Sequence, residues 1–130
     1  MLEKFNTEII SPERKIFSSE TISVTVPAFE GQMSFLKNHI SLITFLRPGL
    51  ITVETEKENI QFFIEEGTVE FTNNNLLILT SSAKNKKELN GKEVLKIIEE
   101  GKKLINNINL SDKEKYILSY KINTLEELVK

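Results

Sequence analysis

The sequence predicts a β plus α fold, with an antiparallel β-sandwich or barrel over residues 1–85 and an antiparallel α-helical hairpin over residues 86–130. Two observations support this prediction. From Phe5 to Ser82 apolar residues recur about every second position, which is the period of a strand with one buried face. Beyond Ala83 the period changes to about 3.6 residues, which is typical of an amphipathic helix.

Within the first part, short strands are separated by turns. Residues 21–26 alternate β-branched apolar and hydroxyl side chains, and Pro27 is expected to end that strand. Residues 60–71 continue the alternation around Gly67, whereas residues 76–79 are apolar on both faces and predict a strand between two layers. Short strands at this spacing favour an antiparallel sandwich or barrel.

The turns between these strands have their own chemistry. Pro48-Gly49 fits the two central positions of a type II turn, in which the glycine takes a positive φ. The run Asn73-Asn74-Asn75 favours a turn with a left-handed residue.

The first predicted helix carries one apolar stripe and ends in the asparagine-rich stretch 106–109. Asn90 and Glu93 resemble a capping box at its start. Gly101 lies within the stripe, which predicts the close approach of another backbone there. The stripe consists of Val94, Ile98, Gly101, Ile105 and Ile108, flanked by Ile97 and Leu104.

Ser111 and Glu114 form a full capping box that begins the second helix. A short connection between two helices predicts an antiparallel hairpin. The polar bridge 84–88 joins this hairpin to the sheet, and we expect it to be a solvated linker.

Composition excludes several functions. The net charge of −2 gives no basic footprint for nucleic acid, and the absence of cysteine removes disulfides, thiolate metal sites and a thiol nucleophile. His39 is the only histidine, so no multi-histidine metal site is possible, and a polar surface or capping role is expected for it. Glu65 and Glu66 are expected to lie in a solvated turn rather than to form a catalytic pair of carboxylates. We predict no catalytic residue, no cofactor and no bound metal.

Other patterns are missing as well. The glycines form no phosphate-binding motif, and no serine lies in a nucleophile elbow. The N-terminus lacks the order of a signal peptide, and the longest strictly apolar run, residues 76–79, is far shorter than the roughly 20 residues of a membrane span. We therefore expect a protein of the cytoplasm that is able to sit on a membrane complex.

Five stretches resemble, in order and spacing, the epsilon subunit of the rotary F-type ATP synthase. Each match is short, but their order and the β-then-two-helix layout together cover essentially the whole chain. The stretches are Ile9-Ile10-Ser11-Pro12-Glu13-Arg14-Lys15-Ile16-Phe17, Val24-Thr25-Val26-Pro27-Ala28-Phe29-Glu30-Gly31, Asn38-His39-Ile40-Ser41-Leu42, Leu46-Arg47-Pro48-Gly49 and Glu66-Gly67-Thr68-Val69-Glu70.

The resemblance implies a sandwich of about ten strands and a helical hairpin. It also implies a central-stalk rotor subunit that joins gamma to the ring of c subunits, on the cytoplasmic face of the energy-transducing membrane, without inserting into it. In many members of the family the hairpin extends along gamma into the catalytic alpha/beta hexamer and inhibits ATP hydrolysis. A hairpin that stays docked on the sandwich is the alternative for this chain. The family positions that face gamma and the c ring match Glu30, Gly31, Gln32, Asn38 and His39.

This chain departs from the family pattern at several positions. Gln32 stands where the family often has a carboxylate, and Ile40-Ser41 replaces Ala-Pro. The family's ATP-binding motif, Leu-Asp-x-x-Arg-Ala, falls on residues 89–94, where Asn90 replaces the aspartate and Glu93 the arginine. A carboxylate about 4 Å from a phosphate charge, at an effective dielectric constant of about 20, is repelled by roughly 4 kcal/mol. We therefore expect no useful affinity for ATP.

Two other functions remain as alternatives. A free-standing β-sandwich module whose hairpin recruits a protein partner fits the same layout, and fractionation distinguishes it, because only a rotor subunit co-purifies with a membrane ATPase. A hydrolase has almost no support in the residues and would require turnover by the purified chain.

Overall fold

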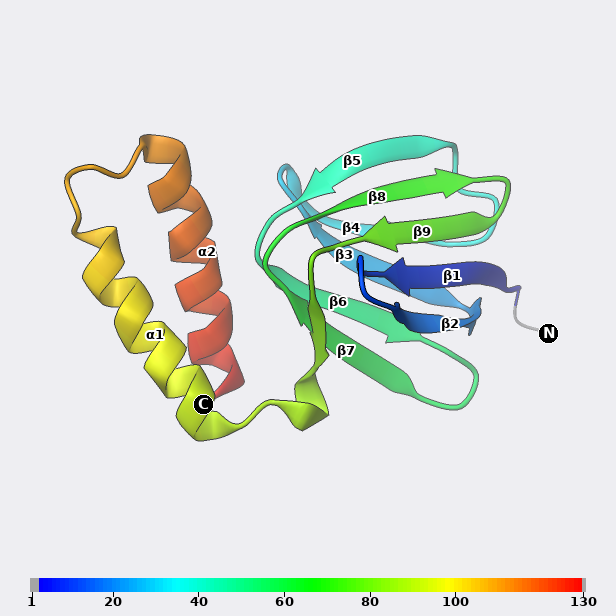
Figure 1. The fold of residues 1–130 in the computed structure, drawn as a ribbon. Helices are drawn as coiled ribbons and strands as arrows, with labels where there is room; N and C mark the ends of the chain where they lie inside the picture. The colour runs from blue at the N-terminus through cyan, green and yellow to red at the C-terminus, as the bar shows by residue number, and fades with distance from the viewer. Residues whose placement is uncertain (1–2, 130) are drawn as a thin grey trace. The chain divides into compact units, whose positions relative to one another are not determined.

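The computed structural model describes residues 3–129, which form strands, a 3-10 turn and two α-helices (Figure 1). The chain divides into two compact units between Lys86 and Lys87. The elements are β1 (Phe5–Ile10), β2 (Lys15–Thr21), β3 (Ser23–Ala28), β4 (Gly31–Phe35), β5 (Leu42–Leu46), β6 (Gly49–Glu54), β7 (Asn59–Ile64), β8 (Gly67–Thr72), β9 (Asn75–Leu79), β10 (Ala83–Asn85), η1 (Lys86–Glu88), α1 (Gly91–Ile105) and α2 (Asp112–Leu128).

The ten strands follow the order β10-β7-β6-β3-β5-β8-β9-β1-β2, and β4 pairs with β3 beside this path. The sheet folds over on itself at β3 to make a sandwich (Figure 1). The predicted β-sandwich followed by a helical hairpin is confirmed. One pairing departs from the antiparallel expectation, because β1 and β9 run parallel, with Thr7 opposite Leu76 and Ile9 opposite Ile78.

The sandwich encloses one apolar core, to which nearly every strand contributes through alternate residues. On β8, for example, Val69 and Phe71 are fully buried while Glu70 is exposed. Three aromatic rings meet in this core, since the Phe71 centroid lies 5.6 Å from that of Phe5 and 5.6 Å from that of Phe35. This interior fixes the positions of the surface turns considered below.

Pro27 does not end its strand. It lies inside β3, at the position where β3 changes partner from β6, which pairs with residues 23–25, to β5, which pairs with Ala28. A proline lacks the N–H that a ladder needs, and at this crossover no such donor is required. Its carbonyl oxygen still accepts a hydrogen bond from the N–H of Arg47 at 2.9 Å.

Gly49 is needed for a reason other than the one predicted. Its φ is not positive, so the type II turn expected at Pro48-Gly49 is wrong, and Gly49 is instead the first residue of β6. A Cβ at this position would lie 2.6 Å from the Cβ of Pro27. The glycine therefore allows β6 to pack against the proline of β3. The prediction for the asparagine run is confirmed, because Asn73 and Asn74 have φ of 50° and 60°.

Two further predictions within the sheet are wrong. Strand β9 is not covered on both faces, since Leu79 is 48% exposed. The bridge at residues 84–88 is not a free linker, because its first residues pair with β7 as part of β10. Lys84 lies opposite Phe63, and the strand places Ala83 in the core.

The helical unit has a narrow interface between its two helices. Val94 and Ile98 of α1 are buried, as are Ile122 and Leu125 of α2. Gly101 faces the side chain of Ile122 rather than a backbone, since an added Cβ would lie 3.0 Å from Ile122 Cγ1. The expected close approach is thus made by a side chain.

The two helix starts differ in their capping. The Ser111 capping box of α2 is complete, with the Ser111 hydroxyl accepting from the N–H of Glu114 at 3.1 Å. At α1, Asn90 caps by accepting from the N–H of Lys92, and the reciprocal bond from Glu93 is absent from the described contacts. The stripe predicted to reach Ile108 stops with the helix, and Ile108 is exposed in the connection.

Candidate partner-contact site

The first group of predicted contact residues forms the tight turn between β3 and β4. Ala28 pairs with Gly31, so that Phe29 and Glu30 make a two-residue loop. Gly31 has a φ of +133°, a conformation that an L side chain rarely adopts. Glu30 and Gln32 flank it with exposed side chains. The turn therefore offers one carboxylate and one amide to a partner, on a backbone that only glycine tolerates.

The second group, Asn38 and His39, lies in the connection between β4 and β5. Asn38 has a φ of 68°, and its backbone N–H donates to Asn74 Oδ1 at 2.6 Å, while Asn74 Nδ2 donates to Asn38 Oδ1 at 3.1 Å. These reciprocal bonds join the β4–β5 connection to the β8–β9 turn. Asn38 thus has a structural role that its sequence position did not indicate, because its partner is 36 residues away.

The His39 ring packs on the edge of the aromatic core. Its centroid lies 4.7 Å from that of Phe35 and 5.5 Å from that of Phe71. Its Nδ1 is 2.7 Å from the carbonyl oxygen of Ile40, and since that oxygen only accepts, Nδ1 carries the hydrogen. In the tautomer with its hydrogen on Nδ1, Nε2 is the acceptor. His39 is therefore an oriented ring, more constrained than the polar surface histidine that was predicted.

The two groups do not form a single site. Gly31 is the first residue of the five-residue strand β4, which spans roughly 17 Å at the usual rise, and Asn38 lies beyond the other end of that strand. They are instead two contact points at opposite ends of one strand.

Sequence reasoning missed the carboxylate of Glu66, which precedes β8. Its Oε1 accepts from the backbone N–H of Ser81 at 2.7 Å, and the Thr80 hydroxyl donates to the Glu66 carbonyl oxygen at 2.6 Å. Hydrogen bonding by Ser81, through its side chain and its N–H, holds the pKa of Glu66 below its usual value against the opposing effect of burial. The charged form is favoured. An adjacent pair of glutamates in a turn gave no signal of this arrangement.

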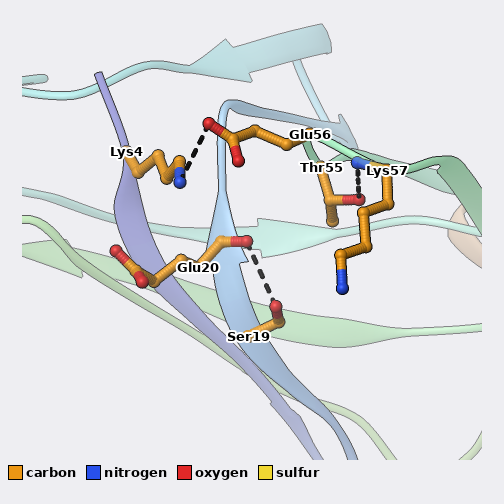
Figure 2. Close-up of polar contacts among 6 residues, drawn as sticks. All are labelled: Lys4, Ser19, Glu20, Thr55, Glu56 and Lys57. Carbon is orange, nitrogen blue, oxygen red and sulfur yellow. Dashed lines mark hydrogen bonds and ion pairs between the residues drawn. The ribbon is translucent and has the colours of Figure 1, made fainter. Parts of the chain in front are cut away.

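The opposite end of the sandwich is ordered by polar contacts of another kind, shown in Figure 2. Lys4 Nζ lies 2.9 Å from a carboxylate oxygen of Glu56, in the turn between β6 and β7. In the same turn the Thr55 hydroxyl accepts from the N–H of Lys57 at 3.3 Å. The hydrogen bond to Glu56 raises the pKa of Lys4. Because these charges are exposed, the contact orders the turn without adding much stability.

Residues 3–129 contain no group of three or more acidic or histidine side chains placed to hold a metal ion. Neither of the two helices in that range combines the length and the hydropathy needed to span a bilayer. What the described surface offers is a set of exposed turns on a rigid sheet.

The fold and these turns define a class of β-sandwich proteins that carry a C-terminal helical hairpin and act through surface contacts. Residues 4–86 match the family described as the ATP synthase delta/epsilon chain β-sandwich domain. Because this match covers more than half of the chain, and full-length relatives agree with it, the chain belongs to the ATP synthase epsilon chain family.

Two relatives extend the match to the helical unit. The chain is 40% identical to an ATP synthase epsilon chain of Pelagibacter ubique over 129 residues, which cover 98% of this chain and 99% of the relative. It is 28% identical to the epsilon chain of Hyphomonas neptunium over 129 residues, or 98% and 96% of the two chains.

Solved structures show the same fold at lower identity. One is a chain of the Euglena gracilis mitochondrial ATP synthase, in a structure of OSCP, F1 and the c-ring, with a TM-score of 0.81 and 20% identity over 98% of this chain and 82% of that one. Another belongs to the central stalk and c-ring structure of the Tetrahymena thermophila enzyme, with a TM-score of 0.67 and 13% identity over 98% of both chains.

Proposed function

We propose that this chain is a central-stalk rotor subunit of a proton-driven ATP synthase, a non-catalytic part of the complex. The observation that carries the proposal is the match to a curated epsilon chain along 98% of the sequence, helical unit included. The sandwich, with its continuous core, suits a coupling that transmits torque, because rigid multipoint contact needs surfaces that do not deform.

In this role the sandwich, residues 1–85, joins gamma to the ring of c subunits at the cytoplasmic face of the membrane, as a peripheral subunit. The two contact points described above are its candidate attachments: the turn around Gly31 and the segment at Asn38 and His39. Their location at opposite ends of β4 supports contacts with two different partners, or with two regions of one partner. Gln32 contributes a hydrogen bond rather than a charge.

The hairpin, residues 86–130, is the candidate regulatory element, and through it the chain reaches the alpha/beta hexamer. Its narrow interface supports this role, since helices of 15 and 17 residues with few buried side chains depend on packing for their stability. Such a hairpin can exchange one supporting surface for another at moderate cost. In the complex it would act as a brake on ATP hydrolysis.

The decisive experiment is truncation inside the complex. Since β10 pairs with β7, the chain is best ended after Lys86 rather than after Ala83. We expect the shortened chain to assemble with ATP synthase as the full chain does, and ATP hydrolysis by the complex to rise. Unchanged hydrolysis with intact assembly would contradict the brake and leave the coupling role standing. Failure of the full chain to co-purify with the membrane ATPase would instead favour the free binding module.

The hairpin does not need ATP for this regulation. Asn90 caps α1 and Glu93 is exposed in its first turn, where a nucleotide phosphate would meet a carboxylate. We expect calorimetry of the isolated chain to detect no binding at millimolar ATP. The double variant N90D/E93R restores the two charged residues of the family motif, leaving Val94 in place of its alanine, and is the matched gain-of-function control. A defined site in the unmodified chain would contradict this part of the proposal.

A further inference from the structure

The β8–β9 turn is hydrogen-bonded to two other segments at the same end of the sandwich (Figure 1). On one side, the backbone N–H of Asn6, in β1, donates to the carbonyl oxygen of Asn74 at 3.1 Å, and Asn6 Nδ2 donates to Asn75 Oδ1 at 3.3 Å. On the other side, Asn74 exchanges two hydrogen bonds with Asn38 of the β4–β5 connection. The turn therefore joins the first strand of the chain to the segment that contains His39.

The two bonds between Asn38 and Asn74 require different groups from the two side chains. Asn74 Oδ1 accepts from the backbone N–H of Asn38 at 2.6 Å, and Asn74 Nδ2 donates to Asn38 Oδ1 at 3.1 Å. The side chain of Asn74 thus both accepts and donates, whereas the side chain of Asn38 only accepts in this pair. Because an aspartate carboxylate has no donor, it can replace the carboxamide of Asn38 without loss of a bond, but not that of Asn74.

This pair holds the residue before His39 in an uncommon conformation. Asn38 has a φ of 68°, in the left-handed region, which asparagine tolerates better than most side chains. His39 follows directly, with its backbone N–H donating to the carbonyl oxygen of Leu36 at 3.1 Å and its ring centroid 4.7 Å from that of Phe35. The position of the His39 ring therefore depends on the conformation of Asn38, and that conformation depends on Asn74.

The same connection carries exposed apolar side chains on both sides of His39. Leu36 is 57% exposed and Ile40 is 77% exposed, although His39 between them is half-buried. These residues lie between β4 and β5 rather than in a strand, so their arrangement relies on the bonds that link the connection to the β8–β9 turn. A connection that is already ordered loses less conformational entropy when a partner binds to it.

We propose that Asn74 is a positioning residue, which holds the His39 segment in its partner-binding conformation through the paired hydrogen bonds with Asn38. The inference rests on the proposed function, in which Asn38 and His39 contact another subunit of the rotor. Asn74 acts through Asn38 and does not itself need to touch the partner. Its effect on association is then the free energy of ordering the connection before binding.

The first test follows His39 in the free, full-length chain by NMR spectroscopy. His39 is the only histidine, so isotope-labelled histidine gives a single ring and a single backbone amide to follow. Asn74→Gly keeps the left-handed conformation, at a φ of 60°, and removes both side-chain bonds to Asn38. We expect hydrogen exchange at the His39 amide to become about tenfold faster and the Nδ1–H resonance to shift or broaden.

Asn73→Gly is the matched control for this variant. It makes the same replacement at the neighbouring left-handed residue, with a φ of 50°, whose carbonyl oxygen rather than its side chain accepts from Asn75 Nδ2 at 3.0 Å. The His39 signals of this variant should match those of the unmodified chain.

A pair of aspartate variants tests the direction of the bonds. Asn38→Asp retains an acceptor for Asn74 Nδ2 and should leave His39 exchange within about twofold of the unmodified rate. Asn74→Asp removes the donor and turns a carboxylate oxygen toward Asn38 Oδ1, so it should accelerate exchange about as much as Asn74→Gly. The two variants add the same charge at neighbouring positions, so charge alone predicts no difference between them.

The second test measures association of the full chain with ATP synthase complexes from which the endogenous subunit has been removed. We expect the dissociation constant of Asn74→Gly to rise about tenfold, because the connection must then be ordered on binding. Asn73→Gly should associate like the unmodified chain.

The outcomes distinguish positioning from direct contact and from the proposed function itself. Unchanged His39 signals in Asn74→Gly, or equal effects of the two aspartate variants, would overturn the positioning role. Weaker association with unchanged His39 signals would also overturn it, since Asn74 would then touch the partner directly. Altered His39 signals with unchanged association would overturn it as well and leave the proposed function intact. If the unmodified chain fails to associate, the proposed function falls, and the positioning role with it.

Discussion

The β-sandwich and the helical hairpin of this chain have cores of very different depth. The sandwich buries residues from strands far apart in the sequence, among them Ile9, Phe35 and Phe71, which have no exposed surface. The hairpin buries a single strip between two helices, formed by Val94, Ile98, Gly101, Ile122 and Leu125.

The difference in core depth indicates that the sandwich resists deformation better than the hairpin. Local opening requires the least free energy where few apolar contacts are lost, so the hairpin opens more readily than the sandwich. A coupling needs the resistant part, and a regulatory element needs the part that is able to change its surroundings. Three variants test this contrast between the two units.

The largest effect is expected in the sandwich core. Phe71→Ala removes a fully buried ring that contacts Phe5, Phe35 and His39, and should lower the free energy of unfolding by about 3–5 kcal/mol. Urea denaturation followed by circular dichroism measures it. The control Phe45→Ala, on the exposed face of β5, should stay within about 0.5 kcal/mol of the unmodified chain. Similar losses for both variants would contradict the description of the core.

A smaller effect, confined to the helices, is expected at Gly101. Gly101→Leu drives a side chain into Ile122, which already lies 3.0 Å from the position of an added Cβ, and should destabilise the hairpin by about 1–3 kcal/mol. Hydrogen exchange should then accelerate in residues 91–128 while the strands keep their protection. Gly91→Ala is the control, because nothing lies within 4 Å of its added Cβ. Equal loss of protection in the strands would show that the two units unfold together.

The smallest effect concerns pH. Hydrogen bonds from Ser81 lower the pKa of Glu66, so its charged form stabilises the fold above the ordinary value near 4.5, and this contribution is lost as the pH falls through the lowered pKa. The unmodified chain should therefore exceed Glu66→Gln in melting temperature at pH 7, and the difference should disappear at strongly acidic pH. A difference in melting temperature that persists in acid would show that altered packing, rather than the lost charge, causes it.

Much of the fold could be predicted because its signals are local. The change of period near Ala83, the asparagine turn at residues 73–75 and the capping box at Ser111 each lie within a few residues of the structure that they specify. The predictions for Pro27 and Gly49 were wrong because contacts between distant strands decide both. Strand β3 changes partner from β6 to β5 at Pro27, and a Cβ at Gly49 would lie 2.6 Å from the Cβ of Pro27.

The residues of the candidate site also fall into two groups, those predicted from their neighbours in the sequence and those whose role depends on distant strands. The turn around Gly31 was identified from its own residues, whereas the link between Asn38 and Asn74 spans 36 positions. The exposed face of β9 could not be predicted, because an apolar run in a sequence looks the same whether both faces of the strand are covered or only one. Leu79 shows this, since it follows a buried residue and is still 48% exposed.

The order of a β-sheet part followed by a helical hairpin, and the motifs that resemble an epsilon chain, could be recognised in the sequence alone. Periodicity, turn residues and helix caps act between residues that are close in the chain, so each can be recognised within a short segment. The exposed strand faces, the hydrogen bond from Ser81 to Glu66 and the location of the contact residues at two ends of β4 are known only from the fold. Those properties depend on the pairing of distant strands, and no single segment contains it.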